Sequence, residues 1–257
     1  MNSSNYQNAV SDKLIVLNQN EQVSVLVSSK NSEPKYYKAF ISSEGEHEVK
    51  SVLSTSIFES TTVIDVNPDF VLCPIGLSQE EQGKHFQLSY EKSGELLSQP
   101  LSQEIDIVYP RQELPFDLAS FLVNPISRVD IQLLHEYKSG LQTKNAVYIS
   151  SIDQQLLIRI YSGQNLLLCN RFDTQNLEEI RYFVLFAVEE LNLDISALHF
   201  EFLGSQKEYE PLKELFNPHL PMLLKLPGKS FDQFDLSSQT IDELADRWFT
   251  SICLECV

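Results

Sequence analysis

The residues with the most direct chemistry in this chain are its four cysteines. Cys253 and Cys256 form a C-x-x-C, a spacing used both by structural zinc sites and by thiol–disulfide exchange. A structural zinc site needs four ligands, and the sequence has no second C-x-x-C and no H-x₃₋₅-H to complete one. We therefore interpret the pair as two thiols on a terminal helix, and Cys73 and Cys169, which stand in apolar runs, as small buried side chains.

Glycine spacing excludes several nucleotide and hydrolase motifs. The 257 residues include only 8 glycines, and no two of them lie closer than seven positions. The dinucleotide-binding G-x-G-x-x-G, the P-loop and the G-x-S-x-G nucleophile elbow each need two glycines closer than that. Glycine is required in these motifs because only it lets the main chain approach a phosphate or adopt positive φ without strain.

The carboxylates show no clear acid–base arrangement. Adjacent pairs such as Glu178-Glu179 and Glu189-Glu190 point about 100° apart on a helix, so they predict solvated faces. The stretch Asp65 to Asp69 could hold a cation, but a turn after a strand explains it more simply.

Charge argues against two classes of partner. The chain has 19 basic and 36 acidic residues, a net charge of −17, and its basic residues are scattered singly. This charge repels phosphate backbones and anionic lipids, so we expect neither nucleic acid nor membrane as a partner. The first 13 residues are polar and no run approaches 18 apolar residues, which favours a cytoplasmic protein.

Two segments about 130 residues apart share one order of elements, three strands followed by a helix. The expected strands and helices cover 13–17, 22–28, 35–42 and 46–58 in the first segment, and 145–150, 156–161, 166–172 and 174–191 in the second. This order predicts two related halves, residues 1–144 and 145–257, although coincidence between common motifs also explains it.

Further elements are expected between and after these segments. They are strands at 63–66, 104–109, 199–203 and 222–226, and helices at 116–123, 126–144, 208–216 and 240–254.

The helix over 174–191 is apolar almost all round. Thr174 is a plausible N-cap, and Leu177, Ile180 and Val184 begin a stripe at helical spacing. Tyr182 and Phe186 belong to further apolar surface outside that stripe. We therefore expect the helix to be buried on more than one face, between a sheet and another layer.

The region from Asn165 to about Leu220 carries a family resemblance. The runs LLLCNRFDTQNLEEIRYFVLFAVEELNLD, HFEFLGS and YEPLKELF resemble a family of uncharacterised bacterial proteins, a domain of unknown function associated with an actin-like ATPase fold. The resemblance implies an α/β fold with a duplicated ribonuclease H-like core: two βββαβαβα-type halves with mixed sheets.

The resemblance also implies a place for ATP between the halves. In active members of that superfamily, each half begins with a hairpin whose Asp-x-Gly type loop binds phosphate and Mg²⁺, and a later strand ends in a glycine near the adenosine. The matching positions in this sequence are Asn18 and Asn20, Asp153 and Gln154, and Gly204 and Ser205. Both hairpins lack glycine, and only Gly204 is of the type that the superfamily uses.

These observations favour a non-catalytic interaction or scaffold protein on a degenerate actin-like ATPase frame, with an unknown protein partner and no cofactor. The alternative is a divergent nucleotide-binding protein or ATPase that uses Asp153 and the Gly204 turn.

Overall fold

A computed structural model describes two units of this chain, which divide between Glu136 and Tyr137. The described residues are 12–19, 22–31, 33–41, 47, 50–51, 53, 58–67, 69–91, 94–114, 122, 124–137, 145–152, 155–204, 206–217 and 223–225. The helices predicted over 46–58, 116–123 and 240–254 lie wholly or mostly outside these residues, as do Cys253 and Cys256.

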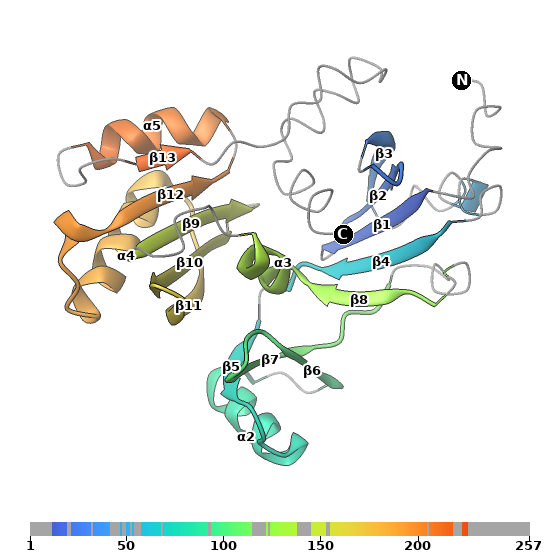
Figure 1. The fold of residues 1–257 in the computed structure, drawn as a ribbon, viewed down its shortest axis with the longest axis horizontal. Coiled ribbons are helices and arrows are strands. Elements are labelled where there is room, and N and C mark those ends of the chain that lie inside the picture. The colour runs from blue at the N-terminus through green and yellow to red at the C-terminus, as the bar shows by residue number, and fades with distance from the viewer. Residues whose placement is uncertain are drawn as a thin grey trace. The chain divides into compact units, whose positions relative to one another are not determined.

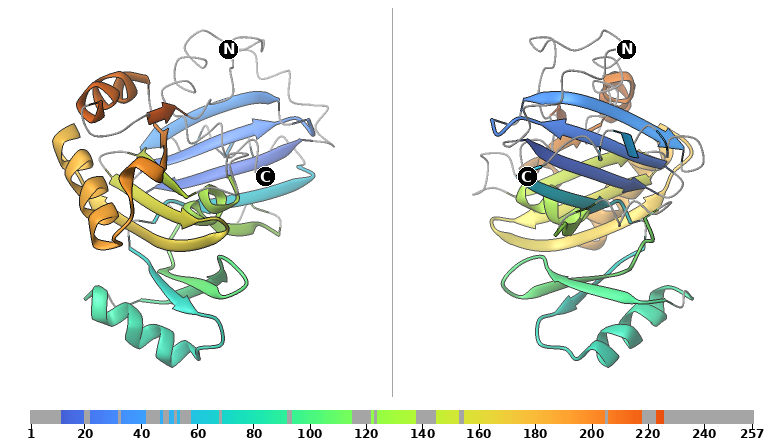
Figure 2. Two further views of the ribbon diagram at one scale, coloured as in Figure 1. Left: turned by 60° about the vertical axis from the view of Figure 1, so that its left-hand side comes forward. Right: turned by 90° about the vertical axis from the view of Figure 1, so that its right-hand side faces the viewer.

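The first unit contains a five-stranded mixed sheet in the order β3-β2-β1-β4-β8 (Figure 1). Its strands are β1 (Lys13–Gln19), β2 (Gln22–Ser28), β3 (Pro34–Ile41), β4 (Ser60–Asp65) and β8 (Ile126–Val129). The first three strands are antiparallel, whereas β4 pairs parallel to β1 and β8 parallel to β4. Figure 2 shows β3, β2 and β1 as blue ribbons lying side by side, with the blue-green β4 next to β1.

Apolar composition explains why β1 lies inside this sheet. Its central residues Leu14 to Leu17 are buried, and a strand buried on both faces needs such a continuous apolar run. The predicted strands at 13–17, 22–28, 35–42 and 63–66 are confirmed.

A three-stranded antiparallel sheet with one helix is inserted between β4 and β8. Its strands are β5 (Val71–Pro74), β6 (Leu96–Pro100) and β7 (Ile105–Pro110), and its helix is α2 (Gln79–Ser89). Of these four elements, the sequence pattern predicts only β7. The start of α2 carries a capping box, in which Ser78 and Glu81 satisfy each other's backbone N–H, and this signal marks the helix.

The helix predicted over 126–144 is wrong in its first part. Residues Ile126–Val129 form β8, and a short helix, α3 (Asp130–Glu136), follows. Parallel pairing of β8 with β4 supplies backbone hydrogen bonds that outweigh the local helical pattern.

The second unit repeats this strand arrangement, in the order β11-β10-β9-β12-β13. Its elements are β9 (Ala146–Ile152), β10 (Gln155–Ser162), β11 (Asn165–Asp173), α4 (Leu177–Glu190), a 3₁₀ turn (Ile195–Ala197), β12 (His199–Leu203), α5 (Gln206–Phe216) and β13 (Leu223–Lys225). Strands β9 to β11 are antiparallel, and β12 and β13 continue the sheet in parallel. These elements confirm the strands and the two helices predicted for this region.

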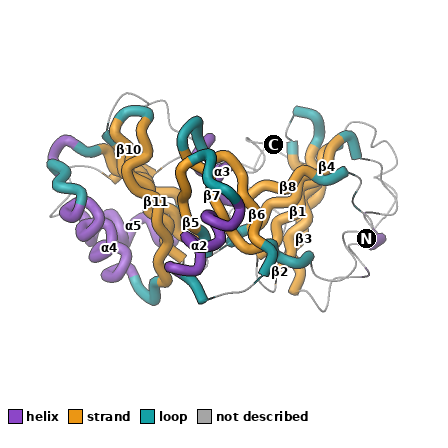
Figure 3. The backbone as a smooth tube through the Cα atoms, turned by 90° about the horizontal axis from the view of Figure 1, so that it is seen from below, coloured by secondary structure: helices purple, strands orange, loops and turns teal. Residues whose placement is uncertain are grey.

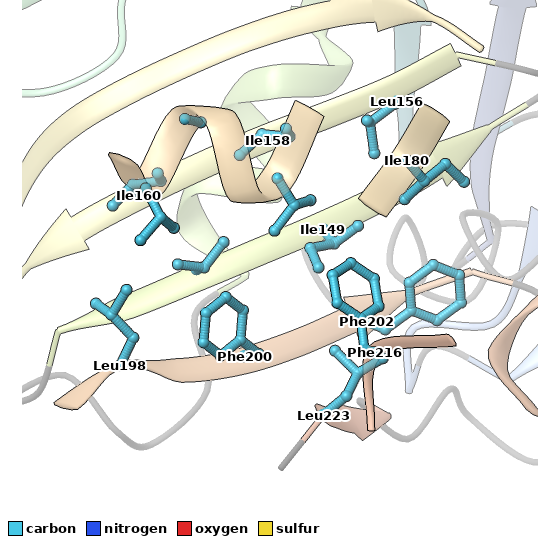
Figure 4. Packing of buried hydrophobic residues seen from close by; sticks show 14 of the residues in the cluster. Ile149, Leu156, Ile158, Ile160, Ile180, Leu198, Phe200, Phe202, Phe216 and Leu223 are labelled. Atoms are coloured by element: carbon cyan, nitrogen blue, oxygen red, sulfur yellow. The ribbon is translucent and has the colours of Figure 1, made fainter. Parts of the chain in front are cut away.

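Helices α4 and α5 contribute to the core on one face of this sheet. Ile149 and Ile158 from the sheet and Ile180 from α4 belong to one buried cluster, which also contains Phe200 and Phe216 (Figure 4). Figure 3 shows α4 and α5 next to each other. No helix in the described part of the chain is long and apolar enough to span a membrane.

Two predictions for α4 are wrong. Its N-cap is Asn176, which has extended backbone and accepts from the Glu179 N–H, and not the buried Thr174. The prediction that α4 is buried on more than one face is also wrong, because Tyr182 is 60% and Phe186 45% exposed. Helix α4 therefore has more apolar surface than the sheet and α5 cover.

Candidate functional site

Three polar side chains meet where neighbouring strands of the first sheet end. Asn18 stands near the end of β1, opposite Asp65 at the end of β4. Asp65 in turn pairs with Val129, the last residue of β8, and Asp130 follows it directly. Because parallel strands end at one edge, residues far apart in the sequence come together. Figure 1 shows this edge of β1, β4 and β8.

The cluster is buried and linked by hydrogen bonds. The Asn18 Nδ2 donates to Asp65 Oδ1 at 3.0 Å and to the Glu113 carbonyl at 3.5 Å. Asn18, Asp65 and Asp130 are 1%, 4% and 0% exposed. Buried carboxylates are rare unless they are paired, so this arrangement marks the strand ends as a candidate site.

Electrostatics at the cluster make Asp65 a weaker acid than an ordinary aspartate. Burial raises the pKa of Asp65 to about 6, and the negative charge of Asp130 adds to the rise. The hydrogen bond from Asn18 and the charge of Arg111 act in the opposite direction. Burial, with the charges of both aspartates, also raises the pKa of Tyr109 well above its usual range.

A segment after β7 is fastened to the end of β4. The Asn67 side chain donates to the Pro110 carbonyl at 2.7 Å, and the Gln112 Nε2 donates to the Val66 carbonyl at 3.2 Å. These bonds place Glu113 within reach of Asn18 and so help to close the cluster.

Gly204 has a packing role in the second unit. It is buried at the end of β12, and a Cβ at this position would lie 2.2 Å from the ring of Phe202. Its backbone is not in the positive-φ region. Glycine is therefore required by the neighbouring ring, whether or not a nucleotide lies near it.

A second buried polar row crosses the sheet of the second unit. Arg159 of β10 and Glu201 of β12 both lie opposite Tyr148 of β9, and each charged residue is 1% exposed. The Arg159 guanidinium stands 5.1 Å from the centre of the Tyr148 ring. Tyr161 packs edge-on against Tyr148, and burial raises its pKa to about 12. This row is a structural network on the sheet face opposite the main core.

A protein-family model identifies the relatives of this chain. The family described as "Protein of unknown function (DUF3822)" matches residues 8–222. The chain belongs to this family. No curated protein sequence matches it.

Solved structures show the fold that this family member has. A Bacteroides thetaiotaomicron protein with an actin-like ATPase fold and unknown function matches with a TM-score of 0.76 and 14% identity, over 100% of both chains. A PilM–PilN type IV pilus biogenesis complex matches with a TM-score of 0.56 and 13% identity, over 94% of this chain and 97% of that one. The chain therefore has an α/β, actin-like ATPase fold with two five-stranded mixed sheets.

The structure describes two of the six predicted site residues. Asn18 lies in the cluster of the first unit, and Gly204 ends β12 in the second. Asn20, Asp153, Gln154 and Ser205 lie outside the described residues.

The cluster suits Mg²⁺ with a nucleotide only in part. Asp65, Asp130 and the Asn18 side-chain carbonyl are hard oxygen donors, and the Asn18 Oδ1 accepts no hydrogen bond from described residues. However, the described residues contain no group of three or more His, Cys, Asp or Glu side chains able to hold a metal. A neutral amide that donates to one of only two carboxylates is a poor fit to a phosphate-bound cation.

Asp65 and Asp130 were not predicted from the sequence as members of one site. Asp65 directly follows the buried strand residues 61–64, and Asp130 directly follows Val129. Carboxylates at the carboxyl ends of strands that pair in parallel were the available signal. It was not usable for Asp130, because residues 126–129 were predicted to be helical.

Proposed function

We propose that this family member is a non-catalytic protein-interaction protein on an actin-like frame. The observation that carries the proposal is the Asn18–Asp65 hydrogen bond. It uses the first hairpin's side chain inside the protein, at the strand end where an active relative would direct a carboxylate at Mg²⁺. Because Asn18 is a neutral amide whose Nδ2 already donates to Asp65, one Asp65 oxygen is engaged inside the protein, and the edge offers Mg²⁺ less charge than a carboxylate at position 18 would.

We further propose that the two sheets are products of a duplication. Numbered in chain order within each sheet, the strands of both have the order 3-2-1-4-5 with the same directions, although among the described residues the first unit alone carries the inserted β5-β7-β6 sheet. A common origin explains one topology occurring twice in one chain.

Binding of a protein partner is supported by a structural neighbour. The PilM–PilN structure is a complex of two proteins, and this chain matches 97% of the chain compared.

We propose that the protein lies in the cytoplasm. In that reducing compartment Cys73 and Cys169 would remain the free thiols that they are in the structure.

A divergent nucleotide-binding function is the second candidate. The observation in its favour is that Asp65, Asp130 and the Asn18 side-chain carbonyl gather oxygen donors at one buried edge. These oxygen donors could contact a cation, but the phosphates of the nucleotide would have to find N–H donors elsewhere.

Two measurements test the proposal. First, the full chain is titrated with Mg-ATP while its thermal unfolding is followed, since a ligand at 100 times its Kd stabilises by about 2.7 kcal/mol. We expect no saturable shift at millimolar nucleotide and no phosphate release. A saturable shift that Asp153→Ala or Asp65→Asn abolishes would overturn the proposal in favour of the second candidate.

The second measurement addresses the partner. The tagged chain is purified at natural abundance from its native cells without nucleotide, and its complex is sized by gel filtration. We expect one partner in a fixed stoichiometric ratio, with a complex that is unchanged by ATP or ADP. Recovery of the chain as a free monomer under all these conditions contradicts an interaction function.

A further inference from the structure

The solvent face of α4 combines two aromatic side chains with four glutamates. Successive residues of a helix advance by about 100°, so Tyr182 and Phe186, at i and i+4, point to one side. Glu178 and Glu179 precede Tyr182 by one turn on that side, and Glu189 and Glu190 follow Phe186 by one turn. We call these six residues the α4 face.

The aromatic centre of the α4 face is continuous with the protein interior. Phe172 of β11 stacks on Phe183 at 4.3 Å between ring centres, and Phe183 meets Tyr182 edge-on at 5.4 Å. Tyr182 then stacks on Phe186 at 5.9 Å. The two outer rings are 60% and 45% exposed, although their neighbours hold them in place. Preorganised aromatic rings of this kind are typical of protein-binding hot spots.

The two pairs of glutamates differ in what they already contact. At the start of α4, Glu178 forms an ion pair with Arg181 at 2.6 Å, and Glu179 accepts from the Gln175 N–H at 2.7 Å. Glu189 and Glu190 form no ion pair within the part of the chain that the structure describes.

The negative charges of Glu189 and Glu190 are electrostatically unfavourable where they lie. They lie in the last turn of α4, which has no basic residue, and the helix dipole makes this end negative. A cation near this end would therefore interact favourably with both the carboxylates and the dipole.

We propose that the α4 face docks a basic, amphipathic segment of a partner protein. An apolar side chain of that segment covers Tyr182 and Phe186, while its lysines or arginines lie at Glu189 and Glu190. This assignment rests on the proposed protein-binding function and adds to it the surface and the chemistry of the partner. A second copy of this chain is a poor occupant, because two copies would bring together the same glutamates on proteins that each carry −17.

The first test uses defined peptides and the full chain. The probe is a fluorescent amphipathic helix made of leucine and lysine, compared with a leucine and glutamate counterpart, at physiological salt. We expect the lysine peptide alone to bind. Tyr182→Ala with Phe186→Ala, and separately Glu189→Lys with Glu190→Lys, should each weaken it by about tenfold or more, which equals about 1.4 kcal/mol.

Matched controls separate docking from general attraction. Ile75→Ala with Leu88→Ala removes exposed apolar side chains from the first unit, and Glu91→Lys with Glu104→Lys makes the same change of charge there. We expect each control to stay within about twofold of the wild type. An equal loss in the controls, or equal binding of both peptides, overturns the proposal.

The second test returns to the native complex. Loss of the stoichiometric partner from both α4 variants, with the controls retaining it, supports the proposal. If both α4 variants keep the partner, the α4 assignment is overturned while the protein-binding function stands. If the wild type has no partner, the proposed function itself fails. Concentration-dependent dimers, or binding to anionic vesicles, that the Tyr182→Ala/Phe186→Ala variant abolishes would instead assign the face to self-association or to lipid.

Discussion

The side-chain amide of Asn18 donates to the carboxylate of Asp65 at 3.0 Å and so joins the ends of β1 and β4, 47 residues apart in the chain. Asp130 adds a second buried carboxyl group at the same edge. This bond provides a neutral donor to a carboxyl group whose charged form is costly to bury. The consequences for stability and for cation binding can both be measured.

Asp65→Asn should change how stability depends on pH. The pKa of Asp65 is about 6 in the folded protein, against an ordinary aspartate value of 3.8, so the folded state holds a proton that the unfolded state loses between these values. The stabilisation that comes from this bound proton is therefore fully present below about pH 4 and is lost as the pH rises through 6. Relative to the variant, the free energy of unfolding of the wild type should fall by about 2–3 kcal/mol across this window.

Urea denaturation of both proteins at pH 4, 5, 6 and 7.5 measures this difference. Asp173→Asn, which removes an exposed aspartate from the second unit, serves as the control for loss of one charge. A constant difference between wild type and Asp65→Asn at all four pH values would show that Asp65 does not titrate in the folded protein as described.

Asn18→Asp should destabilise the first unit. It replaces the donor at 3.0 Å from Asp65 with a third buried carboxyl group, and like charges at this distance cannot both ionise. We expect a loss of about 3 kcal/mol at pH 7.5, while the control Asn31→Asp in an exposed turn stays within about 0.5 kcal/mol. Recovery of stability in millimolar Mg²⁺ would show that the edge accepts a divalent cation after all.

Gly204→Ala should destabilise the second unit by about 1–3 kcal/mol, because the new methyl group overlaps the Phe202 ring. Phe202→Leu should be less harmful in the alanine variant than in the wild type, since it removes the overlapping ring atoms. The control is Gly94→Ala, where the new Cβ has nothing within 4 Å. Additive effects of the two substitutions in chemical denaturation would exclude a direct clash.

Arg159→Lys should be costly although it keeps the charge. The guanidinium is 1% exposed and stands 5.1 Å from the centre of the Tyr148 ring, and a lysine ammonium lacks its planar shape and several of its N–H donors. We expect a loss of about 2 kcal/mol in thermal or urea unfolding. The comparison is Arg181→Lys on α4, whose partly exposed ion pair with Glu178 should be worth under about 0.5 kcal/mol. Equal effects would mean that burial and the ring contact at Arg159 contribute nothing.

The antiparallel strands of the two five-stranded sheets were predictable because their pattern is local. The alternation from Gln22 to Ser28 has the period of a half-buried strand, and the short apolar run from Leu14 to Leu17 with polar residues after it favours a buried strand. The same holds for the β10–β11 hairpin of the second unit, where Gly163 takes the positive φ that a tight turn needs. Residues 126–129 were mispredicted because parallel pairing with β4 has no local signal.

The glycine spacing and the charge of −17 are properties of the sequence alone, and they already exclude the common phosphate-binding loops and argue against anionic partners. Two features of the protein became visible only in the tertiary structure. Asn18, Asp65 and Asp130 became one site only through parallel pairing of distant strands. Tyr182 and Phe186 became a surface, since an apolar pattern states which side chains avoid water but not whether the fold has enough layers to cover them.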